Sequence, residues 1–201
     1  MARTTTARTD AIEAAARLFD RAGYHGAGLA EILETSGAPR GSFYFHFPGG
    51  KEELGVEAIR NAGAQVRAMI ERSAAKDPDP AAMVGRVSRA LARWLEASDY
   101  TQGCAVSNVA LETANGLPAL RAACQEQYDS WIEVLRGPYK AAGISPREAT
   151  RLARTTLAGL EGALLLCRAS RSTDPLRDVT RTLSELLNAR VAGAPPSGGA
   201  H

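Results

Sequence analysis

Three prolines mark helix starts in this chain, and this feature limits the possible folds more than any other. Asp79-Pro80, Ser145-Pro146 and Asp174-Pro175 each place a residue type that caps helices directly before a proline. Proline suits the first helical position because its missing N–H would have no partner there. Strand signals are nearly absent, since β-branched runs and alternating apolar segments are rare. We therefore predict an all-α chain of about nine helices.

Apolar periodicity and end signals predict where each helix lies. Asp10 and Glu13 form a weak capping pattern, although Thr4 to Thr6 could cap a longer helix, and Gly23 is expected to stop the first helix. Ser145 with Glu148 makes a capping box. Gly137-Pro138 is expected to kink or split the helix that contains it. The predicted helices span residues 10–22, 29–36, 40–45, 51–75, 80–98, 104–114, 118–141, 146–170 and 175–191.

The composition is that of an ordinary globular protein, with 45% hydrophobic residues and a net charge of +2. The three cysteines form no CxxC pair, so we expect no disulfide framework, no metal site and a reducing, cytoplasmic setting. No motif for a cofactor is present. The longest apolar stretch, residues 157–167, contains Glu161 and is too short to span a membrane.

Aromatic residues gather in one short stretch, GAPRGSFYFHFPGGKEEL at residues 37–54, which holds three of the four phenylalanines. Short helices on both sides of the turn at Gly37 to Pro39 indicate a helix-turn-helix. Phe43 and Phe47 are four residues apart and share a face, so we expect them to fill a small core with Phe19 and Ile32.

Polar residues of the same stretch are candidate DNA contacts. Tyr44 and His46 have polar tips for a phosphate oxygen, and Arg40 can reach a phosphate or a base edge. Lys51 begins the next helix, whose free N–H groups also favour an anion. Phe45 offers only apolar contact, to a thymine methyl group or a sugar. The alternative is an ordinary polar surface. The DNA-binding candidates are Arg40, Gly41, Ser42, Tyr44, His46 and Lys51.

From Arg8 to Leu54 the sequence resembles the TetR family of bacterial transcriptional regulators. GCAVSNVALE at 103–112 and LEGALLLCRASR at 160–171 are similar to its LmrA/YxaF-like subgroup. Ala27-Gly28 departs from the family, which usually has a Thr/Ser pair there that caps the second helix and touches phosphate. The matching residues are Ile12, Ala15, Phe19, Gly23, Tyr24, Ile32, Gly37, Gly41, Ser42, Tyr44, His46, Phe47, Lys51 and Glu52.

The resemblance implies a homodimer that binds a double-stranded DNA operator and leaves it when an effector binds. It implies a helix-turn-helix domain at residues 1–50 and an effector-binding and dimerisation domain at 51–193. We expect the tail at 194–201 to be disordered.

Apolar helix faces in the second domain predict a cavity for a small lipophilic effector. Asn108 and Glu112 share a helix face, either as polar anchors in that cavity or as structural hydrogen-bonding groups. Glu161 has the same two interpretations. The pocket candidates are Val87, Leu91, Trp94, Cys104, Asn108, Glu112, Trp131, Leu135, Leu160 and Glu161.

An apolar stripe on the last helix and small residues on the helix before it predict a four-helix dimer interface. Alternatively, the stripe closes the core of one subunit. The interface candidates are Ala149, Ala153, Thr156, Ala163, Leu176, Val179, Leu183, Leu186 and Leu187.

The leading hypothesis is a ligand-responsive transcriptional repressor. An effector-free DNA-binding protein is an alternative, although such proteins usually carry more positive charge. An enzyme is disfavoured, because the sequence has no nucleophile–base pair.

Overall fold

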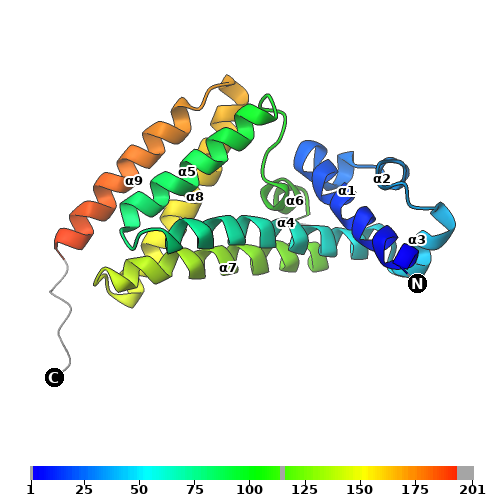
Figure 1. The fold of residues 1–201 in the computed structure, drawn as a ribbon, viewed down its shortest axis with the longest axis horizontal. Coiled ribbons are helices and arrows are strands. Elements are labelled where there is room, and N and C mark those ends of the chain that lie inside the picture. The colour runs from blue at the N-terminus through cyan, green and yellow to red at the C-terminus, as the bar shows by residue number, and fades with distance from the viewer. Residues whose placement is uncertain (1, 114–115, 194–201) are drawn as a thin grey trace. The chain divides into compact units, whose positions relative to one another are not determined.

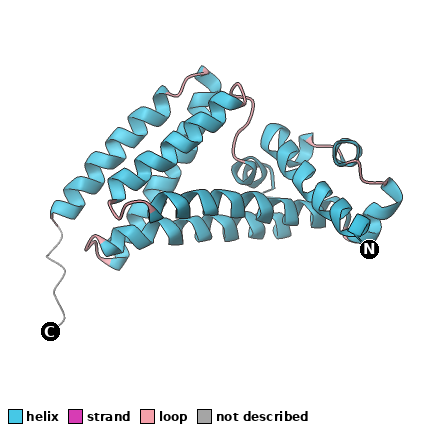
Figure 2. Cartoon of the chain, viewed as in Figure 1, coloured by secondary structure: helices cyan, strands magenta, loops and turns pink. Residues whose placement is uncertain are grey.

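The computed structural model describes residues 2–113 and 116–193, which form nine helices and no strand (Figures 1 and 2). The all-α prediction is therefore confirmed. The tail predicted to be disordered lies outside the described residues. No helix of the described part is both long and apolar enough to cross a membrane. The helices are α1 (Ala2–Gly26), α2 (Leu29–Ser36), α3 (Arg40–His46), α4 (Gly50–Ala75), α5 (Pro80–Ala97), α6 (Ala105–Thr113), α7 (Pro118–Ala141), α8 (Pro146–Ser170) and α9 (Asp174–Ala192).

Two of the three proline-marked starts have the predicted cap. The carboxylate of Asp79 accepts a hydrogen bond from the Ala82 N–H at 2.7 Å, and the Ser145 hydroxyl accepts one from the Glu148 N–H at 3.4 Å. The third prediction is wrong in detail: α9 begins at Asp174, after an N-cap at Thr173 that makes no side-chain bond.

The two predicted interruptions have different outcomes. Gly23 interrupts α1 as predicted, since its backbone is non-helical, with φ 73° and ψ −176°, and kinks the helix between Ala2 and Gly26. Pro138 does not end its helix. α7 runs through Pro138 to Ala141. Proline keeps a helical φ and removes a single N–H, so its effect near the end of a long helix is local.

The described residues form two compact units. The first contains residues 2–65, 103–113 and 116–128, and the second contains residues 66–102 and 129–193. In this division α6 and the first part of α7 belong with α1, α2, α3 and the first part of α4. The predicted domain boundary at residue 50 stays a prediction.

Small residues on α4 explain why the start of α7 belongs to the first unit. A Cβ atom at Gly55 would lie 3.0 Å from a methyl of Leu120, and one at Gly63 would lie 2.3 Å from the side chain of Gln127. Arg60 of α4 also pairs with Glu126 of α7 at 3.1 Å. Glycine therefore lets the two helices approach closely along this length.

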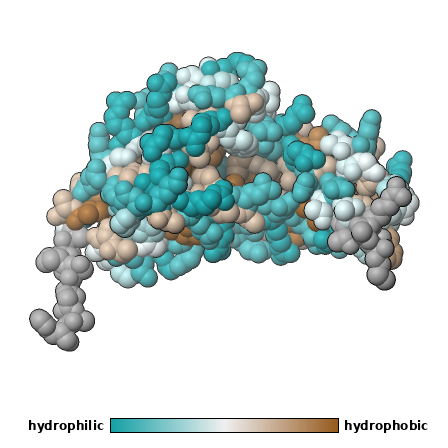
Figure 3. Space-filling view, in the orientation of Figure 1, coloured by the Kyte–Doolittle hydropathy of each residue, from teal (hydrophilic) through white to brown (hydrophobic). Residues whose placement is uncertain are grey.

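The second unit is built on α5, α8 and α9, which contact one another. Gly159 of α8 leaves room for Val179 and Leu183 of α9. Between α7 and α8, the buried hydroxyls of Tyr139 and Thr156 form a hydrogen bond of 3.0 Å. The surface seen in Figure 3 is mainly hydrophilic, with scattered hydrophobic patches.

Candidate nucleic-acid interface

A tight turn sets the start of α3 relative to α2. Gly37 ends α2 in the left-handed conformation, with φ 65° and ψ 12°, and its N–H donates to the Glu34 carbonyl. The Ser36 hydroxyl accepts a hydrogen bond from the Ala38 N–H. The Pro39 carbonyl then accepts from both the N–H and the hydroxyl of Ser42, at 3.0 and 2.8 Å. These bonds satisfy the exposed backbone groups of the turn and fix its geometry.

Two rings of α3 and its C-cap anchor this helix to the first unit. Phe43 and Phe47 are buried, with ring centroids 5.4 Å apart. Phe19 of α1 and Ile32 of α2 are buried as well. The prediction that these four side chains belong to the core is confirmed.

The opposite face of α3 is open to solvent. Tyr44 and Phe45 are 60% and 77% exposed, and Arg40 and Gly41 are also exposed. His46 is half-buried, and its Nε2 atom is buried with no hydrogen-bond partner. The outward face therefore combines a guanidinium, a phenol hydroxyl and an apolar ring.

Lys51 has a partner within the chain. Its Nζ donates to the Tyr24 carbonyl at 2.6 Å and lies 4.4 Å from the centre of the Tyr24 ring. Partial burial lowers the pKa of Lys51, and the carboxylate of Glu112 opposes this shift. Lys51 therefore holds the end of α1, and its predicted phosphate contact stays a prediction.

Helix α6 satisfies backbone groups near the end of α1. The Asn108 amide donates to the carbonyls of Phe19 and Asp20, at 3.3 and 2.8 Å. The Asp20 carboxylate is buried and accepts a hydrogen bond from the Gly103 N–H at 2.7 Å. Asn108 thus has the structural hydrogen-bonding role that was one of its two interpretations.

Glu112 contacts α1 beyond the kink. Its carboxylate accepts a hydrogen bond from the His25 N–H at 2.8 Å. A Cβ atom at Gly23 would lie 1.8 Å from Oε1 of Glu112. We call Asp20, Gly103, Asn108, Glu112 and His25 the α1–α6 network. It joins α6 to the helix that packs behind α2, the first helix of the helix-turn-helix.

The effector-pocket candidates fall in both units. Cys104, Asn108 and Glu112 belong to the first, and the remaining candidates belong to the second. Within the second unit, Trp131 and Leu135 are buried, whereas Trp94 is half-buried. Their contact with an effector stays a prediction. Val87 and Leu160 are also buried, and Leu91 and Glu161 are half-buried.

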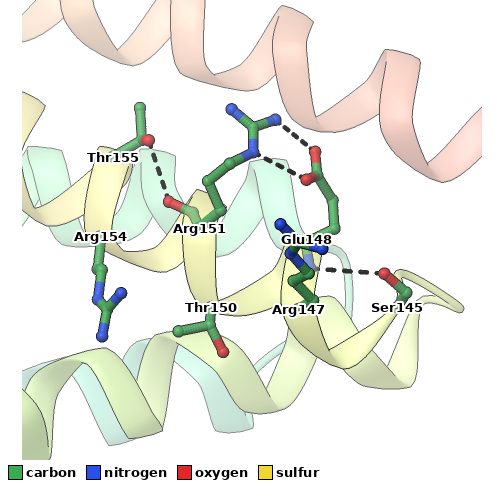
Figure 4. Close-up of a pocket in the computed structure, with 7 residues that line it drawn as sticks. All are labelled: Ser145, Arg147, Glu148, Thr150, Arg151, Arg154 and Thr155. Atoms are coloured by element: carbon green, nitrogen blue, oxygen red, sulfur yellow. Dashed lines mark hydrogen bonds and ion pairs between the residues drawn. The ribbon is translucent and has the colours of Figure 1, made fainter.

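A surface concavity of about 600 Å³ lies beside the first turns of α8 (Figure 4). Arg151 is bonded through two nitrogens to the carboxylate of Glu148, and this hydrogen bonding lowers the pKa of Glu148. None of the pocket candidates lines this concavity. Its lining residues are Ser145, Arg147, Glu148, Thr150, Arg151, Arg154 and Thr155.

Most of the dimer-interface candidates are buried within the single chain. Only Val179 and Leu186 are half-buried. This burial agrees with the alternative interpretation, in which the stripe closes the core of one subunit, and the predicted four-helix interface stays a prediction. The buried candidates are Ala149, Ala153, Thr156, Ala163, Leu176, Leu183 and Leu187.

Two family models match the chain. Residues 11–58 match the bacterial regulatory proteins of the tetR family, and residues 80–182 match the LmrA/YxaF-like transcriptional regulator C-terminal domain. The chain belongs to the TetR family. It is a DNA-binding transcriptional regulator with an LmrA/YxaF-like C-terminal domain.

Individual relatives agree with this family. The chain is 33% identical to the HTH-type transcriptional regulator LmrA of Bacillus subtilis (strain 168), over 90% of this chain and 96% of LmrA. It is 31% identical to YxaF of the same organism, over 90% and 94% of the two chains. These relatives are described as transcriptional regulators, not as enzymes.

Solved structures share the fold. The regulatory protein TetR from Rhodobacter sphaeroides superposes with a TM-score of 0.79 at 25% identity, over 89% of this chain and 97% of that chain. A cysteine variant of CifR, complexed with a 26-base-pair operator duplex, superposes with a TM-score of 0.70 at 24% identity, over 89% and 94%.

The sequence indicated the aromatic stretch but not the α1–α6 network. The only sequence signal of the α1–α6 network was the spacing of Asn108 and Glu112 on a mainly apolar helix. Their partners on α1 lie more than 80 residues away in the sequence, so no local pattern connects them.

Proposed function

We propose that this protein is a ligand-responsive repressor that binds its operator through α3 as a homodimer. The observation that carries the proposal is the division of α3 into two faces. Phe43 is buried, whereas Arg40, Tyr44 and Phe45 are exposed. A short helix anchored by rings on one side and open on the other is what a major groove accepts. CifR, a protein of the same fold, is complexed with operator DNA, which supports DNA binding by this chain.

The test begins with selection of preferred duplexes from a random pool, followed by anisotropy titration of a selected duplex. Arg40→Ala should weaken binding about tenfold and relax the preference at one position, as loss of a base contact does. The matched control is Arg121→Ala, which removes another exposed arginine, on α7. Equal weakening by both substitutions would mean that α3 contributes only general positive charge.

The dimer, we propose, forms through the exposed face of α8. Leu165 and Leu166 are 53% and 59% exposed, and the neighbouring Ala158, Gly162 and Ala169 are exposed as well. Small residues beside leucines allow close approach of a partner helix, and burying these leucines supplies the driving force.

Sedimentation velocity tests this interface. Leu165→Glu should produce monomers, whereas the control Leu111→Glu, at a 74% exposed position on α6, should leave a dimer. A dimer that survives Leu165→Glu would place the interface elsewhere.

A small lipophilic effector is proposed to bind the C-terminal domain and release the operator. The support is the LmrA/YxaF-like domain match together with apolar side chains of the second unit, including the half-buried Trp94. A screen of lipophilic compounds should find one that changes tryptophan fluorescence and releases DNA at the same concentration. The Trp94→Phe variant would then assign the fluorescence change. If no compound releases DNA, the effector-free alternative is favoured.

A further inference from the structure

Phe45 is the most exposed of the large hydrophobic side chains in the described residues, at 77%. The three other phenylalanines, Phe19, Phe43 and Phe47, are all buried. A phenylalanine left in water gains no burial energy, so its presence here calls for a partner outside the chain.

The helical register places Phe45 at the centre of the outward face of α3. Each residue turns an α-helix by about 100°, so Phe45 lies about 200° from both Phe43 and Phe47 and points away from the core. Gly41 and Ser42, four and three residues earlier, share its face and are small. Tyr44 and His46, each about 100° from Phe45, flank it on the two sides.

The ring of Phe45 is also positioned by a neighbour. Its centroid lies 5.3 Å from that of His46, at an interplanar angle of 76°. Edge-to-face pairs of this kind restrict a ring without covering it. A Cβ at Gly41 would meet no atom within 4 Å, so nothing crowds the surface beside Phe45.

We propose that Phe45 reads the methyl group of a thymine in the operator, which makes it a specificity-determining residue. This inference rests on the proposed binding of DNA through α3. The floor of the major groove presents donors, acceptors and a single apolar group, the thymine C5-methyl. A ring at the centre of the outward face meets the floor, whereas Tyr44 and His46 at its sides meet the sugar–phosphate walls. The register therefore favours the methyl group over the sugar.

Deoxyuracil tests this directly, because it removes the methyl group and leaves the pairing edge intact. In a duplex selected by the wild-type protein, each thymine is replaced in turn by deoxyuracil, and Kd is measured by anisotropy at one salt concentration. One replacement should weaken wild-type binding about fourfold, the value of one buried methyl-sized group. Phe45→Ala should bind the thymine and uracil duplexes equally.

Two further variants serve as controls. Tyr44→Phe should keep the discrimination between thymine and uracil, because the methyl contact is made by the neighbouring ring. Phe45→Leu should retain part of it. Since the ring of Phe45 is exposed, Phe45→Ala should melt at the wild-type temperature, which confirms that the variant is folded.

Three results would overturn the inference. Wild-type protein that ignores every replacement, while Phe45→Ala weakens all duplexes alike, would assign Phe45 to the sugars. If the selected duplexes contain no thymine that binding requires, Phe45 has no methyl group to contact. In both cases the proposed repressor still binds DNA selectively. A random pool that yields no preferred duplex would instead overturn the proposed function, and the inference with it.

Discussion

Replacing Gly23 with alanine should destabilise the protein strongly. Gly23 has φ 73° and ψ −176°, a region that only glycine adopts readily, so alanine there costs about 2 kcal/mol. Its Cβ would lie 1.8 Å from Oε1 of Glu112, so the carboxylate must move, and its Oε2 then gives up the hydrogen bond from the His25 N–H. That loss adds about 1 kcal/mol. The sum, about 3 kcal/mol, is a large share of the stability of a typical domain.

A double-mutant cycle with Glu112→Ala separates the two contributions. Glu112→Ala alone should cost about 1 kcal/mol, mainly through loss of the hydrogen bond from the His25 N–H. In the double variant the hydrogen bond is lost only once and the clash is absent. Its loss of free energy of unfolding should therefore be about 1 kcal/mol smaller than the summed losses of the two single variants. Urea unfolding followed by circular dichroism gives each free energy of unfolding.

Gly37→Ala is the matched control. Gly37 also has a positive φ, 65°, but a Cβ there would meet no atom within 4 Å. Gly37→Ala should lower the free energy of unfolding by about 1 kcal/mol, and this effect should add to that of Glu112→Ala. Strict additivity of Gly23→Ala with Glu112→Ala would refute the contact between α6 and the kink.

Three other substitutions probe the fold. Gly28→Ser should stabilise the protein by a few tenths of a kcal/mol, because Gly28 is the N-cap of α2 and makes no side-chain bond; urea unfolding checks this. Gly63→Ala should cost about 1–2 kcal/mol through its clash with Gln127, and an unchanged melting temperature would contradict the packing of α4 on α7. Burial raises the pKa of Tyr139 to about 12, so the unfolded chain releases this proton first and the free energy of unfolding should fall as pH rises from about 10 to 12. Tyr139→Phe should weaken that pH dependence in alkaline unfolding measurements.

Much of the secondary structure could be read from the sequence because its signals are local. A cap bond such as Asp79 to Ala82 spans three residues, and the αL residue Gly37 needs only its own missing side chain. The errors also have local causes: alternative caps compete at Asp174, and Pro138 lies too near a helix end to break it.

The exposed face of α3 was predictable for a similar reason. Phe43 and Phe47 are four residues apart and therefore lie on one face of the helix, the inner one. The remaining side chains point outward. The family resemblance then assigned that outer face to DNA.

What the sequence by itself determined was therefore the set of helices, the helix-turn-helix and the family. Only the tertiary structure decided the partners of Lys51, Asn108 and Glu112, and the burial of Leu176, Leu183 and Leu187 within one chain. An apolar stripe indicates that one face of a helix must be buried. It does not indicate which surface covers that face, because the hydrophobic effect is non-directional. A polar side chain on such a helix likewise needs a partner, and here that partner is backbone on α1, brought close only by folding.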